Sequence, residues 1–282
     1  MRITRIGSIA TGWGESLVWD DRAARLYFVD CADATLQWLE GGDGAHGSLA
    51  MPSMPTGVVP TEDGRLLVVL DDGLHLVDPD AGRVELVTGW PDGLGARAND
   101  ACADLHGNVI TGTLNLGPDE GSAWRWSPTD GWRLIDPDIS NTNGPNVAVL
   151  DGDETLVVGD TSAVYWAYPY DGATGDVGER RSFGDPATGE GTGPDGATFD
   201  ADGGLWCAIF GAGRLVRFAG DGTNRVVPVD AVNPTDVAFG GANLDRLFVT
   251  TIAGEGELDG ALLVVDDLGA RGRPEPRCAV VG

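Results

Sequence analysis

The sequence contains no lysine, so all 18 of its basic residues are arginine, and it has only 4 cysteines in 282 residues. The absence of lysine excludes Schiff-base chemistry. Cys31, Cys102, Cys207 and Cys278 form no CxxC pair and have no histidine at ligand spacing. This distribution predicts free thiols in a reducing compartment and argues against a zinc site.

Histidine is equally scarce. His46, His75 and His106 share no spacing, and the sequence has no GxSxG elbow. A histidine metal site and a Ser-His-Asp triad are therefore both disfavoured. No apolar pattern with helical spacing runs beyond two turns, which favours strands throughout.

Long apolar runs are also missing. No stretch approaches the roughly 20 apolar residues that span a bilayer, and residues 1–15 lack the apolar core of a secretory signal. Acidic residues outnumber basic ones by 44 to 18, giving a net charge of −26, which would repel nucleic acid and anionic membranes. We expect a soluble cytoplasmic protein without nucleic-acid or membrane partners; the choice between a monomer and a small homo-oligomer stays open.

One feature that is present is a segment that recurs six times. Each copy is a turn of Asp, Gly and Asn, a short strand, and then a second strand. Equivalent points in the copies are Leu26, Leu66, Val109, Leu156, Leu205 and Leu247, spaced 40, 43, 47, 49 and 42 residues apart. This period predicts a single domain over residues 1–282, an all-β six-bladed β-propeller with four antiparallel strands per blade. Residues 2–6 should close the ring by pairing with residues 277–281.

The repeat places oxygen-bearing or small residues where each inner strand enters the central channel. These residues are Glu15, Thr56-Gly57, Asn99, Asn143, Asp195 and Thr235-Asp236. Carboxylate and amide oxygens that converge from separate strands suit a divalent cation. Two carboxylates and one amide leave coordination positions open for water or substrate.

Five motifs occur in order at blade spacing: GWGESLVWDD (12–21), RANDACAD (97–104), TNGP (142–145), GPDGATFDADGGLW (193–206) and NPTDVAFGGANLDRLFVTT (233–251). Together they resemble the gluconolactonase, regucalcin and senescence-marker-protein family of six-bladed propellers. The resemblance covers almost the whole chain. It implies metal-dependent hydrolysis of a small, probably sugar, lactone, with a cation that polarises the carbonyl and acidifies a bound water.

The resemblance also implies roles for individual residues. It places the ligands of one divalent cation (Ca²⁺, Zn²⁺, Mg²⁺, Mn²⁺ or Fe²⁺) on Glu15, Asn143 and Asp195, with Asp195 also acting as the base. It places substrate contacts on Arg97 and Asn99. Residues two apart on a strand face the same way, so both can reach the channel.

The sequence departs from the family pattern at three places, one of which is a brief segment after residue 253 that carries Glu255, Glu257 and Asp259. Ser16-Leu17 replaces the family's Pro after the glutamate. The loop 112–124 is short, with Asn115, Asp119 and Glu120 as its polar residues, and we include Glu120 among the predicted substrate-binding residues.

Several alternatives stay open. The ring could be a non-catalytic or regulatory cation site, completed by Glu255, Glu257 or Asp259, or it could serve another ring-opening or ring-closing reaction. Asp100 could orient Arg97 or only pin a turn. Trp13, two residues from Glu15, is expected to border the pocket.

Overall fold

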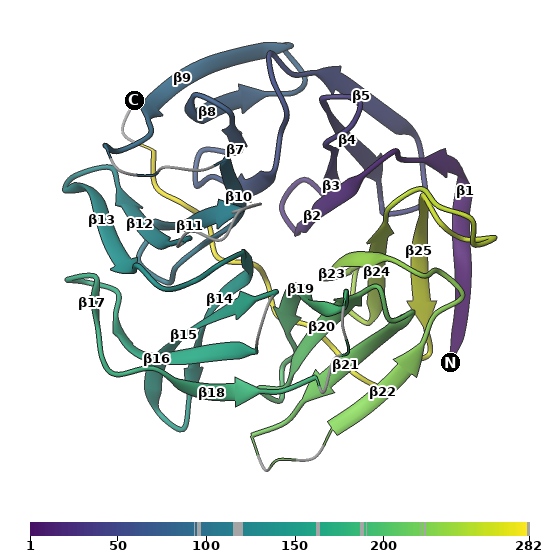
Figure 1. Ribbon diagram of the computed structural model, residues 1–282. Helices are drawn as coiled ribbons and strands as arrows, with labels where there is room; N and C mark the ends of the chain where they lie inside the picture. The colour runs from purple at the N-terminus through teal and green to yellow at the C-terminus, as the bar shows by residue number, and fades with distance from the viewer. Residues whose placement is uncertain are drawn as a thin grey trace.

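The computed structural model describes residues 1–92, 94, 97–114, 121–161, 164–186, 189, 191–220, 222 and 224–280. Six β-sheets stand around a central channel in a closed ring (Figure 1). No described residue lies in a helix. Accordingly, that part of the chain holds no helix long and apolar enough to cross a membrane. The predicted six-bladed β-propeller is confirmed.

Each blade begins with an inner strand that lines the channel. The inner strands of blades 1 to 6 are β2 (Gly14–Asp20), β6 (Gly57–Pro60), β10 (Arg97–Ala103), β14 (Thr142–Leu150), β19 (Gly193–Phe199) and β23 (Pro234–Gly240). Each contacts the inner strands of both neighbouring blades, so the contacts form a closed circle. The oxygen-bearing residues singled out by the repeat lie at or just before the first residues of these strands.

The repeated segment supplies the second strand of each blade and its partner the third. The second strands are β3 (Arg25–Asp30), β7 (Leu66–Leu70), β11 (Val109–Leu114), β15 (Asp153–Asp160), β20 (Leu205–Phe210) and β24 (Arg246–Thr251). The third strands are β4 (Thr35–Glu40), β8 (Gly73–Asp78), β12 (Ala123–Ser127), β16 (Tyr165–Asp171), β21 (Arg214–Phe218) and β25 (Ala261–Asp266). All six equivalent points of the repeat fall in second strands.

The outer strands of blades 1, 2, 3 and 5 are β5 (His46–Ala50), β9 (Arg83–Gly89), β13 (Gly131–Asp136) and β22 (Asn224–Pro228). In blade 4 the outer edge is divided between β17 (Asp176–Val177) and β18 (Arg181–Gly184), which both pair with β16. In blade 6 the outer strand is β1 (Arg2–Ala10), taken from the other end of the chain.

β1 closes the ring, but it pairs with a different segment from the one that the sequence predicted. Residues 2–5 pair antiparallel with residues 263–266 of β25. Residues 277–281 were the wrong partner: Cys278 pairs with Thr61 of blade 2 instead, and residue 281 lies outside the described residues. The third strand of blade 6 has its outer edge free for β1, whereas residues 277–280 lie across the channel axis.

The core is divided into six apolar clusters, one between each pair of adjacent blades. Between blades 1 and 2, for example, Val29 and Leu36 pack with Val58 and Val68. The remaining five clusters follow the same pattern around the ring. Each fully buried Leu or Val contributes about 1.5–3 kcal/mol through removal of its side chain from water. Blade-to-blade burial is therefore what holds the ring together.

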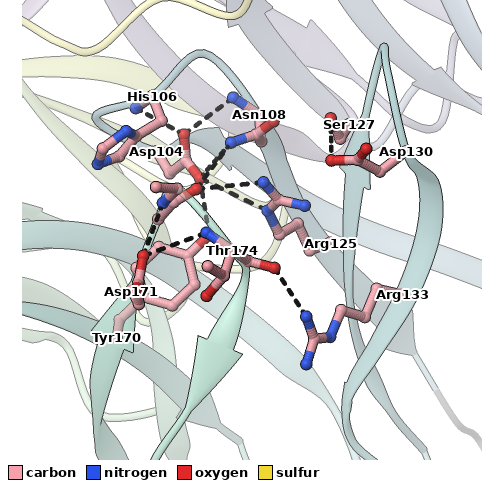
Figure 2. Close-up of polar contacts among 12 residues, drawn as sticks. Asp104, His106, Asn108, Arg125, Ser127, Asp130, Arg133, Tyr170, Asp171 and Thr174 are labelled. Carbon is pink, nitrogen blue, oxygen red and sulfur yellow. Dashed lines mark hydrogen bonds and ion pairs between the residues drawn. The ribbon is translucent and has the colours of Figure 1, made fainter.

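A buried polar network reinforces the junction between blades 3 and 4 (Figure 2). The Asp104 carboxylate is fully buried and accepts hydrogen bonds from the Tyr170 hydroxyl at 2.7 Å and the Asn108 amide at 2.9 Å. Arg125, 2% exposed, donates to the carbonyl of Gly172 at 3.1 Å. His106 lies at the rim of this network and contacts Glu154 at 2.8 Å, so it serves the blade junction and not the channel.

The last residues of the chain form a strap across the base of the ring, which we define as residues 271–280. The strap makes backbone hydrogen bonds to Leu244 of blade 6 and Ala201 of blade 5, and Arg273 donates to the Val147 carbonyl of blade 4 at 2.9 Å. Farther along, Cys278 bonds Pro60 of blade 2.

The same strap also reaches the two remaining blades. Ala279 donates to the carbonyl of Gly107, next to blade 3, at 2.8 Å. Arg277 binds Asp20 of blade 1 at 2.5 Å. Figure 1 shows this segment in yellow, crossing the ring beneath the inner strands. It therefore touches every blade and closes the base of the channel.

Candidate active site

The channel mouth is shaped by irregularities at the start of the inner strands. Except in β6, the register of each inner strand shifts near its first residues: around Glu15, Asn99, Asn143, Pro194 and Pro234. A β-bulge leaves extra residues unpaired and re-aims side chains, which is why bulges are frequent beside functional sites. Blade 2, whose β6 is regular, contributes no carboxylate or amide to the mouth.

The three predicted metal ligands lie at these irregular strand starts. Asn143 and Asp195 are 7% and 5% exposed, and Glu15 is half-buried. Glu15 lies in β2, Asn143 in β14 and Asp195 in β19. The structure thus brings residues 52 to 180 positions apart in sequence to the starts of inner strands around one channel.

Hydrogen bonds fix the orientation of the Asn143 amide. Its Nδ2 donates to Thr161 Oγ1 at 2.6 Å, and its Oδ1 accepts from Asn99 Nδ2 at 2.8 Å. An amide oxygen has two lone pairs, so one remains for a cation. Asn99 Nδ2 also donates to the Thr142 carbonyl at 2.9 Å. Since both N–H groups of Asn99 are engaged, its Oδ1 is the atom left to accept a bond from a ligand hydroxyl.

Arg97 and Asn99 face the same way on β10, as predicted from strand geometry. Both are half-buried, while Ala98 between them is buried. The Arg97 guanidinium lies over the Trp13 ring, with Cζ 5.2 Å from the ring centroid, and its Nη1 contacts Met54 Sδ. Its Nη2 is buried and has no partner among the described residues. A buried donor without a partner is costly, so Nη2 is suited to bind a ligand oxygen.

Four carboxylates crowd the channel. Burial raises the pKa of Glu15 to about 8; the negative charge of Asp100 adds to this effect, whereas the Trp13 hydrogen bond and the Arg97 charge oppose it. Burial, followed by the charges of Glu15, Asp236 and Asp100, raises the pKa of Asp195 well above its usual range. The channel therefore contains more carboxyl groups than the Arg97 guanidinium can neutralise.

A divalent cation fits this arrangement. Among the described residues, no three His, Cys, Asp or Glu side chains are placed to hold a metal ion by themselves. A site at the mouth consequently needs the Asn143 amide beside Glu15 and Asp195. Two carboxylates and one amide are hard oxygen donors, and a bound cation would relieve the repulsion between the carboxylates.

Two further carboxylates lie deeper in the channel. Asp100 accepts the backbone N–H of Gly144 at 2.8 Å, and Asp236 accepts that of Leu17 at 2.5 Å. The sequence left two roles open for Asp100: orienting Arg97 or fixing a turn. The hydrogen bonds support the second role, since they hold the backbone of the neighbouring bulge. Leu17 stands where the family motif has Pro, which lacks an N–H, so the bond to Asp236 depends on this departure.

Below these carboxylates lies a cavity of about 40 Å³. Asp100, Asp236 and Asn146 line it, and Glu275 and Pro276 of the strap form its floor. Glu275 accepts a hydrogen bond from Thr198 at 3.0 Å. The strap thus closes the channel at its base.

Among the other sequence candidates, Glu120, like Asn115 and Asp119, lies outside the described residues. Glu255 and Glu257 are exposed. Asp259 accepts the backbone N–H groups of Gly256 in its own loop at 2.8 Å and of Val232 in the connection before β23 at 2.7 Å.

Sequence reasoning missed two features of the site. The strap residue Glu275 carried no signal, because the segment around it has no repeat partner. Trp13 was expected only to border the pocket, yet its Nε1 donates to Glu15 Oε1 at 2.9 Å. Trp13 lies one residue before β2, and its spacing of two residues from Glu15 could have revealed this contact if the extended backbone had been expected to begin at Trp13.

Comparison with known proteins agrees with the fold and the motifs. The SMP-30/Gluconolactonase/LRE-like region matches residues 13–253. Pentonolactonase XacC of Haloferax volcanii is 31% identical over 99% of this chain and 99% of its own length. The 6-deoxy-6-sulfogluconolactonase of Pseudomonas putida is 31% identical over 84% of this chain and 82% of its own.

Among solved structures, a calcium-binding protein, regucalcin, from Agrobacterium tumefaciens superposes with a TM-score of 0.87 at 26% identity, over 97% of this chain and 96% of its own. The chain therefore belongs to the SMP-30/gluconolactonase/LRE-like family, and the resemblance drawn from its motifs is confirmed.

Proposed function

We propose that this protein is a divalent-cation-dependent lactonase that opens a small sugar lactone to its hydroxy acid. The observation that carries the proposal is the convergence of Glu15, Asn143 and Asp195 beside the unpartnered Nη2 of Arg97. This combines a cation site with a donor for a substrate oxygen in one open mouth. The names of the two lactonase relatives supply the substrate class.

A bound divalent cation supplies Lewis-acid activation of the carbonyl and of a water. The proton transfers are carried out by side chains. An Asp195 carboxylate oxygen takes a proton from the water as it attacks the carbonyl carbon, and the proton then goes to the ring oxygen when the C–O bond breaks. We assign this role to Asp195 because, as a proposed cation ligand, its carboxylate would lie close to the attacking water.

Arg97 and Asn99 divide the binding of substrate between them. Arg97 Nη2 is the donor available for the developing oxyanion. Asn99 Oδ1 accepts a substrate hydroxyl, because both of its N–H groups are already bonded within the protein. A polyhydroxylated lactone has a carbonyl oxygen for Arg97 and hydroxyl groups for Asn99, whereas an alkyl lactone has no hydroxyl group for Asn99.

A non-catalytic cation-binding role is the second candidate, favoured by the description of the regucalcin structure as a calcium-binding protein. Such a site would be enclosed by protein oxygens. Here Glu255 and Glu257 are exposed and Asp259 is bonded to the backbone N–H groups of Gly256 and Val232, so none of the three is positioned as a further ligand. This difference favours an open, catalytic site.

The decisive test is hydrolysis of a panel of five- and six-membered aldonolactones, measured by acid release. The metal-stripped protein should show only the spontaneous rate, and one or more of Ca²⁺, Zn²⁺, Mg²⁺, Mn²⁺ and Fe²⁺ should restore turnover. Stoichiometric metal binding without turnover of any lactone would instead support the cation-binding role.

Replacing Arg97 separates substrate binding from cation binding. Arg97→Ala should retain the metal and lower kcat/KM by about 10²-fold, because it removes one oxyanion donor. Arg97→Lys should recover little of this loss, since an ammonium does not reproduce the planar fork over Trp13. Metal content by elemental analysis and kinetics at saturating metal provide the two measurements. Unchanged kcat/KM across the panel would remove Arg97 from the site.

A further inference from the structure

Trp13 contacts both halves of the proposed site. Its indole Nε1 donates to Glu15 Oε1 at 2.9 Å, and the Arg97 Cζ lies 5.2 Å from the centroid of its ring. Glu15 is a proposed cation ligand in blade 1, and Arg97 is a proposed substrate residue in blade 3. One side chain thus links the group that holds the cation to the group that meets the substrate.

The backbone of Trp13 is held firmly enough for this task. Its N–H donates to Asp30 Oδ1 at 3.0 Å, and its carbonyl accepts the N–H of Cys31 at 2.8 Å. It also forms an antiparallel bridge with Ile252 of blade 6. Because the backbone of Trp13 is bonded on two sides, its ring can support the Arg97 guanidinium in one position.

The contacts of Arg97 show what the platform achieves. With its face on the Trp13 ring and Nη1 against Met54 Sδ, the guanidinium leaves Nη2 buried without a partner among the described residues. The attraction between a guanidinium and an aromatic face favours one orientation of this long side chain. Nη2 is therefore pre-oriented for a ligand oxygen.

We propose that Trp13 is a positioning residue: its N–H orients the Glu15 carboxylate toward the cation, and its ring face orients Arg97 toward the substrate. The inference rests on the proposed lactonase function for its substrate half only. The cation half stands on the contact with Glu15 and can be tested without turnover.

Two variants separate the two contacts. Trp13→Phe keeps the ring face and removes the N–H. It should weaken Mn²⁺ binding about 10–100-fold by calorimetry, as loss of a ligand's hydrogen-bond partner does, and leave kcat/KM unchanged at saturating Mn²⁺. Trp13→Leu removes both contacts, so it should weaken Mn²⁺ binding to a similar degree and also lower kcat/KM at saturating Mn²⁺. In that background, Arg97→Ala should lower kcat/KM little further, because the two changes remove the same interaction.

Trp90→Phe is the matched control. Trp90 is also half-buried and hydrogen-bonded, to the Leu70 carbonyl at 3.1 Å, but has no contact with the proposed ligands. It should bind Mn²⁺ like the wild type. If Trp13→Leu does not fold, Trp13→Met replaces it as a variant without an aromatic face.

Each half of the proposal can be overturned separately. Wild-type Mn²⁺ affinity in Trp13→Phe overturns the link to Glu15. Equal kcat/KM values of Trp13→Phe and Trp13→Leu at saturating Mn²⁺ overturn the link to Arg97. If the wild type binds Mn²⁺ but hydrolyses no lactone, the proposed function fails, while the Mn²⁺ measurements still decide the role of Trp13 toward Glu15.

Discussion

Asp195→Ala is expected to abolish both cation binding and lactone hydrolysis. The substitution removes one of three proposed ligands together with the proposed base, so kcat/KM should fall by at least about 10³-fold. Elemental analysis should find less than one equivalent of metal. The far-UV circular dichroism should remain that of a β protein, because Asp195 lies near the start of the inner strand β19 and does not belong to the apolar clusters between blades.

Electrostatics sharpen this expectation. Burial and three neighbouring carboxylates disfavour the charged form of Asp195, so metal-free Asp195→Asn should be at least as stable as the metal-free wild type. We expect Asp195→Asn to have a higher Tm than the wild type when both are metal-free, and its Tm should no longer rise when metal is added. This result would show that the Asp195 carboxylate lowers stability in the absence of metal and is retained for cation binding.

Glu257→Ala is the matched control for Asp195. It also removes one carboxylate, but from an exposed position in the 255–259 loop. Metal content and kcat/KM should match the wild type. A full equivalent of metal in Asp195→Ala, or loss of metal in Glu257→Ala, would contradict the ligand assignment and favour the cation-binding alternative.

The second large effect is expected at the strap. Arg277→Ala should lower the free energy of unfolding by about 3–5 kcal/mol, the usual cost of leaving one member of a buried ion pair without its partner. The Arg277 side chain is 8% exposed and that of Asp20 is 2% exposed, with 2.5 Å between Nη2 and Oδ1. Urea titration followed by tryptophan fluorescence measures this quantity.

Arg22→Ala provides the comparison for Arg277. Arg22 lies in the same region and carries the same charge, but it is exposed, and its guanidinium donates to the Glu62 carbonyl at 3.0 Å. Its removal should change the free energy of unfolding by no more than about 0.5 kcal/mol. Equal effects of the two substitutions would show that the strap does not stabilise the ring through this ion pair.

Much of the site could be predicted from sequence because it follows the repeat. Glu15, Asn143 and Asp195 each stand near the start of an inner strand, so one alignment of blades located all three. Glu120 could not be treated in the same way, because the 112–124 loop departs from the repeat in length. The crowding of Asp100 and Asp236 below the mouth also escaped the pattern, since burial of a carboxylate depends on neighbouring blades.

The sequence by itself determined the six blades, the position of each second and third strand, and the ring of oxygen donors. Alternation and turn residues are local, and they recur every 40 to 49 residues. Only the tertiary structure decided that β1 pairs with β25, that residues 271–280 cross the base, and that Trp13 joins Glu15 to Arg97. Contacts such as Arg277 with Asp20 join residues 257 positions apart, and no local pattern specifies them. They arise once closure of the ring brings the inner strands of all six blades around one axis.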